Sequence, residues 1–379
     1  MKLSIEKKQD IKDMPKRIPI NGTFELTVRC NLHCKMCLFR HDDKENGEIL
    51  LKELTATQWI DIAKQVAKAG TMSLLITGGE PMIRSDFCEI WEGIYKQGFI
   101  MELYTNATLV TPRILETLRK YPPHKIGITI YGAGSETYKN VCGSAEAFTQ
   151  AIYGIQALQT LPSTIAFRTT IIKDNYNDVK AIEQLVKEKF HSESEITETR
   201  LVMNSVRGAC TKVSSCRLEA KENIELMLHR SFEQLNEKAK KKGIELSGYD
   251  IHIKKKEKND GYHNLNTKLT LLGCDAGMRS YTISWDGRLL ICQLLEKYSS
   301  DIIKSSFEDE WKILPMRVEI PILSKKCRQC KYYDICPACP ASRYAETGDM
   351  GGAADYFCKD VQELMKYING RNNNEEKRV

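Results

Sequence analysis

Three cysteines near the start of the chain have the spacing of iron–sulfur ligands. Cys30, Cys34 and Cys37 form a Cys-x3-Cys-x2-Cys run directly after an apolar segment, Phe24 to Val28. A loop of this length can wrap three corners of a cubic [4Fe–4S] cluster, whereas four thiolates would complete its ligation. The fourth iron would then stay open for a ligand that the protein does not supply. The alternative is a zinc site completed by a more distant residue such as His33.

A second cysteine-dense segment lies in the last third of the chain. Part of it has the spacing Cys-x2-Cys-x5-Cys-x2-Cys, which suits either iron–sulfur clusters or a pair of zinc ions. Metal binding would supply stability that so small and loop-rich a segment cannot draw from apolar burial. The cysteines of this segment are Cys274, Cys292, Cys327, Cys330, Cys336, Cys339 and Cys358.

A Gly-Gly-Glu-Pro run, Gly78 to Pro81, follows the β-rich segment Met72–Thr77. Two glycines let the backbone approach a ligand closely, and Glu80 offers an acceptor for a cationic amine. By itself this run is also what an ordinary tight turn between a strand and a helix looks like. Its position after the cysteine loop favours a binding role.

The elements that must position these residues alternate between β-rich runs and amphipathic helices over residues 23–203. Thr55 and Gln58 form a capping box at one helix start, and Thr111-Pro112 places a cap and then proline at another. Six such units predict parallel strands with right-handed crossovers, which a barrel or a doubly wound sheet would satisfy equally. The expected strands are Phe24–Val28, Met72–Thr77, Met101–Thr105, Lys125–Tyr131, Ile165–Ile172 and Thr199–Met203.

The composition fits a cytoplasmic metalloenzyme. The chain has 379 residues, 42% of them hydrophobic, and a net charge of +6. The segment Met1–Arg17 is charged and has no apolar core, so we expect no signal peptide, and no apolar run is long enough to span a bilayer. Fourteen cysteines in such a chain indicate metal ligation instead of disulfides. We expect neither a nucleic-acid nor a membrane partner.

The cysteine loop together with the Gly-Gly-Glu-Pro run resembles the radical S-adenosylmethionine (radical SAM) enzymes. The resemblance implies an α/β fold, a partial (β/α)6 barrel with the cysteine loop at the C-terminal ends of its strands. It implies that S-adenosylmethionine chelates the open iron and is cleaved reductively to a 5′-deoxyadenosyl radical. Met36 stands where many members have an aromatic residue. The cofactor contacts that the resemblance implies are Gly78, Gly79, Glu80, Pro81, Asn106, Thr129 and Arg168. For the last three, ordinary capping or packing is the alternative.

The C-terminal cysteines are similar to the SPASM extension of that family, which holds two auxiliary [4Fe–4S] clusters. The resemblance thus implies three [4Fe–4S] clusters and the division 20–215 barrel, 216–265 helical bridge, 266–365 SPASM domain and 366–379 polar tail. The usual spacing after the third cysteine of the motif is x3, whereas here it is x2. The implied ligands are Cys327, Cys330, Cys336 and Cys358 for the outer cluster and Cys274, Cys292 and Cys339 for the inner one.

Members of this group mostly modify peptides, by thioether or carbon–carbon cross-linking, by epimerisation, or by sulfatase maturation. Gln293 stands where sulfatase-maturing relatives carry an aspartate that serves as base, so that alternative is disfavoured. A non-catalytic iron–sulfur electron carrier is the other alternative. The implied partners are a precursor peptide and an electron donor such as flavodoxin or ferredoxin. The roughly twenty residues before the first strand are too few for a leader-binding domain, so a leader is expected to be held by a separate leader-binding protein or by the barrel and SPASM surfaces.

Four cysteines are left outside these sites. Cys88 and Cys142 are expected to be structural. Cys210 and Cys216 follow the sixth expected strand, at the end of the barrel where chemistry is expected. One of them could be the fourth ligand of the inner cluster or a thiol that donates a hydrogen atom to a substrate radical. The alternative is that both are simply small apolar residues.

Overall fold

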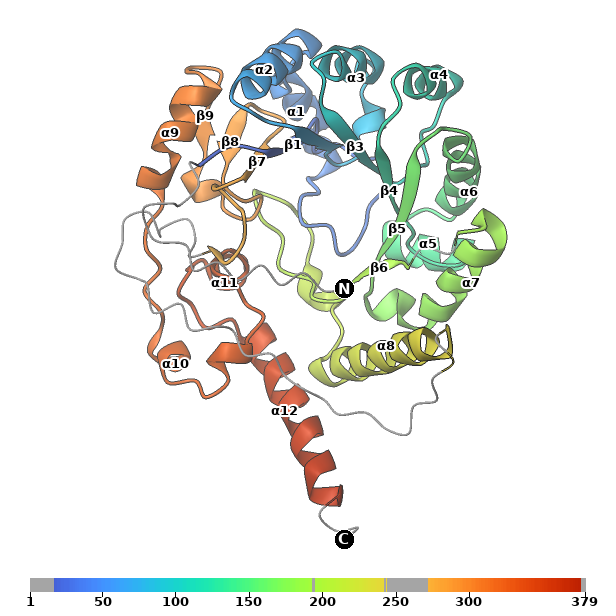
Figure 1. Ribbon diagram of the computed structural model, residues 1–379, viewed down its shortest axis with the longest axis vertical. Helices are drawn as coiled ribbons and strands as arrows, with labels where there is room; N and C mark the ends of the chain where they lie inside the picture. Colours follow the sequence, from blue (N-terminus) through green and yellow to red (C-terminus); the bar gives the residue numbers. More distant parts are fainter. Residues whose placement is uncertain (1–16, 193–194, 242, 244–271, 376–379) are drawn as a thin grey trace.

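The computed structural model describes residues 17–192, 195–241, 243 and 272–375. Its centre is a nine-stranded sheet in the order β6-β5-β4-β3-β2-β1-β7-β8-β9 (Figure 1). The six strands from β1 to β6 are parallel, and helices lie around the outside of their curve. This is the predicted α/β partial barrel.

The barrel strands are short and mostly alternate buried with partly exposed residues, as one buried face requires. On β2, for example, Leu74 and Ile76 are buried, and on β4 Ile126 and Ile128 are buried. Phe24 on β1 packs its ring 5.0 Å from that of Trp59 on α2. The strands are β1 Asn21–Glu25, β2 Ser73–Thr77, β3 Ile100–Thr105, β4 Lys125–Thr129, β5 Thr164–Thr170 and β6 Thr197–Thr199.

Two predicted strands are displaced. β1 ends at Glu25, so the segment that follows already belongs to the approach to the cysteine loop, where Thr27 and Arg29 bond to the turn after β2 through their carbonyls. β6 ends at Thr199, where the predicted strand began. The residues beyond it leave the sheet because they bond to the C-terminal region: Asn204 donates its N–H to Glu346 at 2.8 Å.

The helix starts that local chemistry predicts are present. Thr55 and Gln58 form the capping box of α2, and Thr111 caps α4 with proline in its first turn. α7 is preceded by a short 3-10 helix, Lys173–Asp178, which the sequence did not predict, and α1 and α5 were not predicted either. The helices are α1 Asn46–Lys52, α2 Ala56–Lys68, α3 Phe87–Tyr95, α4 Pro112–Lys120, α5 Ser135–Cys142, α6 Glu146–Leu158 and α7 Val179–Phe190.

The C-terminal region continues the barrel's own sheet. β7 (Ser280–Ile283) pairs in parallel with β1 in the register Asn21↔Ser280, and β8 (Arg288–Leu290) and β9 (Ser300–Asp301) follow in antiparallel order. Tyr281 lies 4.8 Å from the ring of Phe307 on α9, so the two regions share one core. The remaining helices are α8 Ala220–Lys241, α9 Phe307–Arg317, α10 Lys325–Arg328, α11 Pro340–Thr347 and α12 Asp355–Glu375.

α8 and α12 pack against each other at the lower end of the view in Figure 1. α8 covers most of the first half of the predicted helical bridge, and residues 244–265 of that bridge lie outside the described residues. None of the helices in the described ranges has the length and apolar character that a membrane crossing requires.

Candidate iron–sulfur and cofactor sites

The first cysteine loop lines a cavity of about 320 Å³ at the end of the barrel to which the loops after the strands converge. Cys30, Cys34 and Cys37 all line this cavity, and Cys30 and Cys37 are close enough to act electrostatically on Cys34. Cys30 Sγ accepts from the Leu32 N–H at 3.4 Å and from Asn106 Nδ2 at 3.9 Å. Donors of this kind complement the negative sulfurs of a cluster.

The surroundings of these three thiols keep them protonated unless a metal binds them. Burial raises the pKa of Cys30 to about 12 and that of Cys37 above its usual value. A hydrogen bond with the Cys142 thiol, and then burial, raise the pKa of Cys34 further. Only a bound metal would turn such thiols into thiolates at neutral pH, so the residues present fit a three-cysteine cluster site.

The zinc alternative is not favoured by the arrangement. His33 is exposed, and its Nε2 lies 2.6 Å from an Asp43 carboxylate oxygen. Across the described ranges, no three His, Cys, Asp or Glu side chains converge closely enough to hold a single metal ion. A cubic cluster holds its cysteine sulfurs farther apart than a single metal ion does. The three cysteines therefore need not converge on one point to hold a [4Fe–4S] cluster.

Two residues beside Cys34 were not identified as part of the site from the sequence. Cys142, the last residue of α5, lies against the Cys34 thiol, and the Tyr131 hydroxyl also bonds to it. The carbonyls of Val141 and Cys142 accept from the backbone of the cysteine loop, at 3.0 and 2.8 Å. The position of Cys142 after the fourth strand was the only signal, and it does not reveal this contact.

The two glycines of the Gly-Gly-Glu-Pro turn are required by the protein's own backbone. Gly78 has φ 151°, and a Cβ there would lie 2.4 Å from the Thr27 carbonyl oxygen. A Cβ on Gly79 would lie 2.3 Å from the Arg29 carbonyl oxygen. The turn therefore fits directly against the segment that leads into the cysteine loop, and any side chain would push the two apart.

Glu80 lies behind this turn with no exposed surface. Its carboxylate accepts from the Thr105 hydroxyl at 2.9 Å, from the Asn106 N–H at 2.8 Å and from the Met82 N–H at 3.1 Å. Burial outweighs these bonds and raises the pKa of Glu80 to about 7. Its charge acts on Cys30, so the carboxylate lies next to the first cysteine, and Pro81 begins a short 3-10 turn behind it.

The other implied cofactor contacts differ in position. Asn106 is buried between Glu80 and the cysteine loop, with Nδ2 3.0 Å from Asn31 Oδ1. Thr129, at the end of β4, lines the cavity. Arg168 on β5 is not among the residues that line it; its guanidinium lies 4.5 Å from the centre of the Tyr104 ring.

The root of the cysteine loop is held by a network of buried charges. Glu53 accepts from Arg29 Nε at 2.8 Å and from Arg84 Nη1 at 3.2 Å. Arg84 also bonds to the Leu26 carbonyl at 3.0 Å and to Asp86 at 2.8 Å. The Arg29–Glu53 bond and the bond of Arg84 to the Leu26 carbonyl tie the residues just before Cys30 to neighbouring elements.

The three cysteines of the implied inner site come together from distant parts of the chain. Cys274 precedes β7, Cys292 follows β8 and Cys339 caps α11. Burial raises the pKa of Cys292 to about 11, with Cys339 and Cys274 close enough to raise it further. Arg207 also acts on Cys292 while forming a buried ion pair with Glu25 at 2.6 Å.

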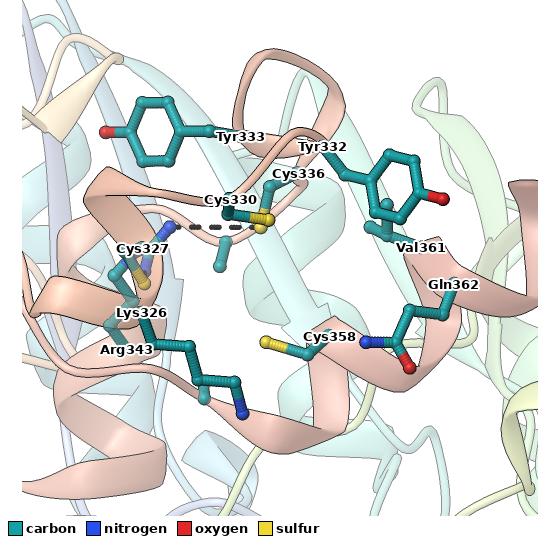
Figure 2. A pocket seen from close by; sticks show the side chains of 12 residues that line it. Lys326, Cys327, Cys330, Tyr332, Tyr333, Cys336, Arg343, Cys358, Val361 and Gln362 are labelled. Carbon is teal, nitrogen blue, oxygen red and sulfur yellow. Dashed lines mark hydrogen bonds between the residues drawn. The ribbon is translucent and has the colours of Figure 1, made fainter.

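The four cysteines of the implied outer site line one cavity between α10, α11 and α12 (Figure 2). Cys330 and Cys336 lie in the loop above it, Cys327 comes from α10 and Cys358 from α12. The donor set of four cysteines around one space fits a fully ligated cluster. Arg343, which the sequence did not single out, lies in the wall of this cavity.

Cys210 and Cys216 lie in different places. Cys210 is exposed beside the cysteine loop, where its Sγ lies 3.5 Å from Arg40 Nη1 and its N–H bonds to the Arg40 carbonyl at 2.8 Å. Cys216 is buried, with its thiol 3.2 Å from the Val213 carbonyl oxygen. The arrangement therefore associates Cys210 with the first cysteine site and favours neither thiol as a fourth ligand of the inner one.

Sequence comparisons find the Radical SAM superfamily over residues 24–186. The chain is 28% identical over 347 residues to an AdoMet-dependent heme synthase of Methanosarcina barkeri, covering 86% of this chain and 92% of that protein. It is 26% identical over 172 residues to the antilisterial bacteriocin subtilosin biosynthesis protein AlbA of Bacillus subtilis. That match covers 45% of this chain and 37% of AlbA.

Among solved structures, Streptococcus suis SuiB bound to S-adenosylmethionine has the same fold. The TM-score is 0.62 at 17% identity, over 90% of this chain and 77% of SuiB. SuiB has also been solved bound to its precursor peptide SuiA, with the same TM-score. The three-cysteine loop, the Gly-Gly-Glu-Pro turn packed against it and the family match agree, and residues 24–186 form a radical SAM domain.

Proposed function

We propose that this radical SAM enzyme modifies a ribosomally made peptide, by forming a thioether or carbon–carbon cross-link or by epimerisation. When bound, S-adenosylmethionine and the first cluster supply the 5′-deoxyadenosyl radical that abstracts a hydrogen atom. Cys30, Cys34 and Cys37 would hold that cluster, and Glu80 with Asn106 would orient the amino group of the cofactor. Thr129 lines the same cavity and is proposed to contact the ribose.

The lining of the cavity carries this proposal. Past the cysteine loop its wall is made of threonines, Tyr131 and apolar side chains, and among the residues that the structure describes Arg40 is the only charged one in the lining. Such a wall suits an uncharged stretch of peptide and excludes water from a radical. The other lining residues beyond the loop are Thr170, Thr199, Leu201, Val202 and Met203.

A second candidate is a tetrapyrrole substrate, and the similarity to the Methanosarcina barkeri protein over most of the chain favours it. Carboxylated tetrapyrroles such as iron coproporphyrin carry several negative charges, which need cationic partners in a binding site. A wall with Arg40 alone offers little such charge, and for that reason we place the peptide first.

The assay that tests both candidates begins with reconstituted enzyme, S-adenosylmethionine and a reductant under anaerobic conditions. 5′-Deoxyadenosine should form, and its rate should increase when the correct precursor peptide is added. Mass spectrometry of the peptide should show a loss of two hydrogens for a cross-link or no mass change for an epimerised product. Turnover of iron coproporphyrin, with no peptide product, would replace the peptide with the tetrapyrrole as substrate.

A further inference from the structure

Arg343 is a buried cation in the wall of the outer cysteine site (Figure 2). It is 4% exposed and projects from α11. Its Nη1 lies 2.8 Å from Cys327 Sγ and 3.0 Å from the Gly352 carbonyl oxygen, and its Nη2 lies 3.8 Å from Cys336 Sγ. The guanidinium therefore contacts two of the four sulfurs that surround this cavity.

Among the described residues, no carboxylate pairs with this guanidinium. In the part of the chain that the structure describes, the partners recorded for the guanidinium are those two sulfurs, the Gly352 carbonyl and the face of Tyr333 at 5.7 Å. An arginine side chain stays protonated in a protein, and a buried charge requires a negative partner. The negative groups available to it are the thiolates of a metal-bound Cys327 and Cys336.

A cluster with four thiolate ligands gains one negative charge when it is reduced. Hydrogen bonds to its sulfurs and a nearby positive charge stabilise the reduced form and thereby raise the reduction potential. Arg343 supplies both. We propose that Arg343 raises the reduction potential of the outer cluster, so that this cluster accepts the electron released by the substrate. This inference rests on the proposed function, and on cross-linking in particular.

The electron count supports a role for such an acceptor. Hydrogen abstraction leaves a carbon radical on the peptide, and attack by a peptide thiol forms the carbon–sulfur bond. The thiol proton passes to solvent, and one electron remains to be removed. The oxidised cluster takes up that electron. α11 joins the two auxiliary sites along this path, because Cys339 of the inner site caps the helix and Arg343 follows one turn later.

The test uses full-length protein in which Cys30, Cys34 and Cys37 are replaced by Ala, so that only the auxiliary clusters remain. Arg343→Gln removes the positive charge. Arg343→Lys keeps the charge but loses the pair of guanidinium nitrogens that contact Cys327 and Cys336. Arg328→Gln is the matched control, because Arg328 is adjacent to Cys327 and exposed. Potentials are measured by redox titration followed by electron paramagnetic resonance, and iron content is measured for each variant.

We expect Arg343→Gln to lower the reduction potential of one auxiliary cluster by at least 59 mV, which is a tenfold change in the equilibrium constant for one electron. Arg343→Lys should give a smaller shift. The second auxiliary potential and the Arg328→Gln protein should be unchanged. Full iron with unchanged potentials in both Arg343 variants would overturn the inference. Loss of one cluster from both variants would also overturn it, because Arg343 would then only hold the site together.

The iron content of the parent protein, in which Cys30, Cys34 and Cys37 are replaced by Ala, distinguishes a missing outer cluster from a wrong role for Arg343. If it holds iron for only one auxiliary cluster, about four atoms, and replacing Cys327 by Ala leaves that iron in place, the outer cluster itself is refuted before any Arg343 variant is considered. If it holds about eight and the Arg343 variants behave like the parent, the outer cluster stands and only the role of Arg343 is lost.

Discussion

Glu80 shows how a single carboxylate can be prepared for a cation. All of its recorded hydrogen bonds come from its own chain, from Thr105, Asn106 and Met82. They orient the carboxylate but do not offset its burial, which keeps its pKa near 7. A positively charged amine beside it would supply what these neutral donors do not.

Replacing Glu80 by Gln preserves the shape of the side chain and removes its charge. A hydrogen bond to a charged group contributes about 1.5–3 kcal/mol, so the affinity for S-adenosylmethionine should fall about ten- to hundredfold. Equilibrium binding to cluster-loaded protein measures this. Glu89→Gln, an exposed change on α3, serves as the control. Unchanged affinity at normal iron content would mean that the carboxylate only braces the turn.

The same carboxylate predicts a pH dependence with a definite sign. Because burial raises its pKa to about 7, Glu80 is mostly protonated below that pH and cannot pair with an ammonium group. The affinity for S-adenosylmethionine should therefore rise from about pH 6 to about pH 8 and then level off. Binding titrations across this range should give a flat profile for Glu80→Gln. A wild-type profile that is equally flat would contradict the prediction.

The burial of Glu80 also predicts how the stability of the protein depends on pH. A carboxyl whose pKa is higher in the folded than in the unfolded chain binds more protons when folded, so its contribution to stability decreases as the pH rises from about 4.5 to about 7. The cofactor should restore that loss above pH 7, because its cation favours the ionised form. Thermal denaturation at about pH 4.5 and about pH 7, with and without S-adenosylmethionine, measures this change in stability.

Cys210 and Cys216 can be separated by single substitutions. Cys210→Ala removes an exposed thiol beside Arg40 at the first cysteine site, whereas Cys216→Ala changes a buried thiol bonded to a carbonyl. If Cys210 donates a hydrogen atom, its variant should form 5′-deoxyadenosine and hold full iron but fail to complete an epimerised product. Cys216→Ala should affect stability alone. Normal product from the Cys210 variant would leave that thiol without a chemical role.

At the scale of elements, the cysteine loop is fixed from three sides. The Gly78-Gly79 turn lies against its root, the end of α5 accepts its backbone N–H groups, and Glu53 pairs with Arg29 and Arg84 beneath it. A cluster ligated by only three cysteines depends on such support, because its open iron contributes no link to the protein.

Glu53→Gln tests the charged part of that support. The change leaves two buried guanidinium groups with less negative charge, and breaking a buried pair typically costs about 3–5 kcal/mol. We expect about 3 kcal/mol, since Asp86 still pairs with Arg84. Chemical denaturation and iron content should both report it. Glu92→Gln removes an exposed pair with Lys96 and should change neither.

The sequence predicted what is encoded locally. The Cys-x3-Cys-x2-Cys loop, the capping box at Thr55 and the cap at Thr111 depend on residues a few positions apart, and each is where it was expected. The pairing of β1 with β7 joins residues about 260 positions apart and leaves no periodic signal in either strand. The contact of Cys142 with Cys34 and the position of Arg343 among the outer cysteines depend on the same long-range packing.

At the scale of the whole molecule, three cysteine groups lie along one connected body. The first is at the barrel mouth, the second joins the β7–β8 region to the start of α11, and the third is enclosed by α10, α11 and α12. Arg207 links the first two regions, since it pairs with Glu25 of β1 and acts on Cys292. Neighbouring elements therefore connect the three cysteine groups.

From these three groups we propose three clusters. Three [4Fe–4S] clusters require about twelve iron atoms per chain, and replacing Cys30, Cys34 and Cys37 by Ala should leave about eight. The same change should abolish 5′-deoxyadenosine formation. Iron analysis of anaerobically reconstituted protein measures the count. A wild-type value near four would remove both auxiliary clusters.

The pairing of β7 with β1 has a consequence for any attempt to divide the protein. Removing the C-terminal region would strip β1 of one hydrogen-bonded neighbour and leave it as an open sheet edge with its N–H and C=O groups exposed. Such an edge is a template for pairing with another chain, so a barrel truncated before Cys274 should precipitate or form mixed oligomers. Its failure to bind cofactor would then reflect aggregation, and a shortened protein would give no valid account of what the barrel alone can do.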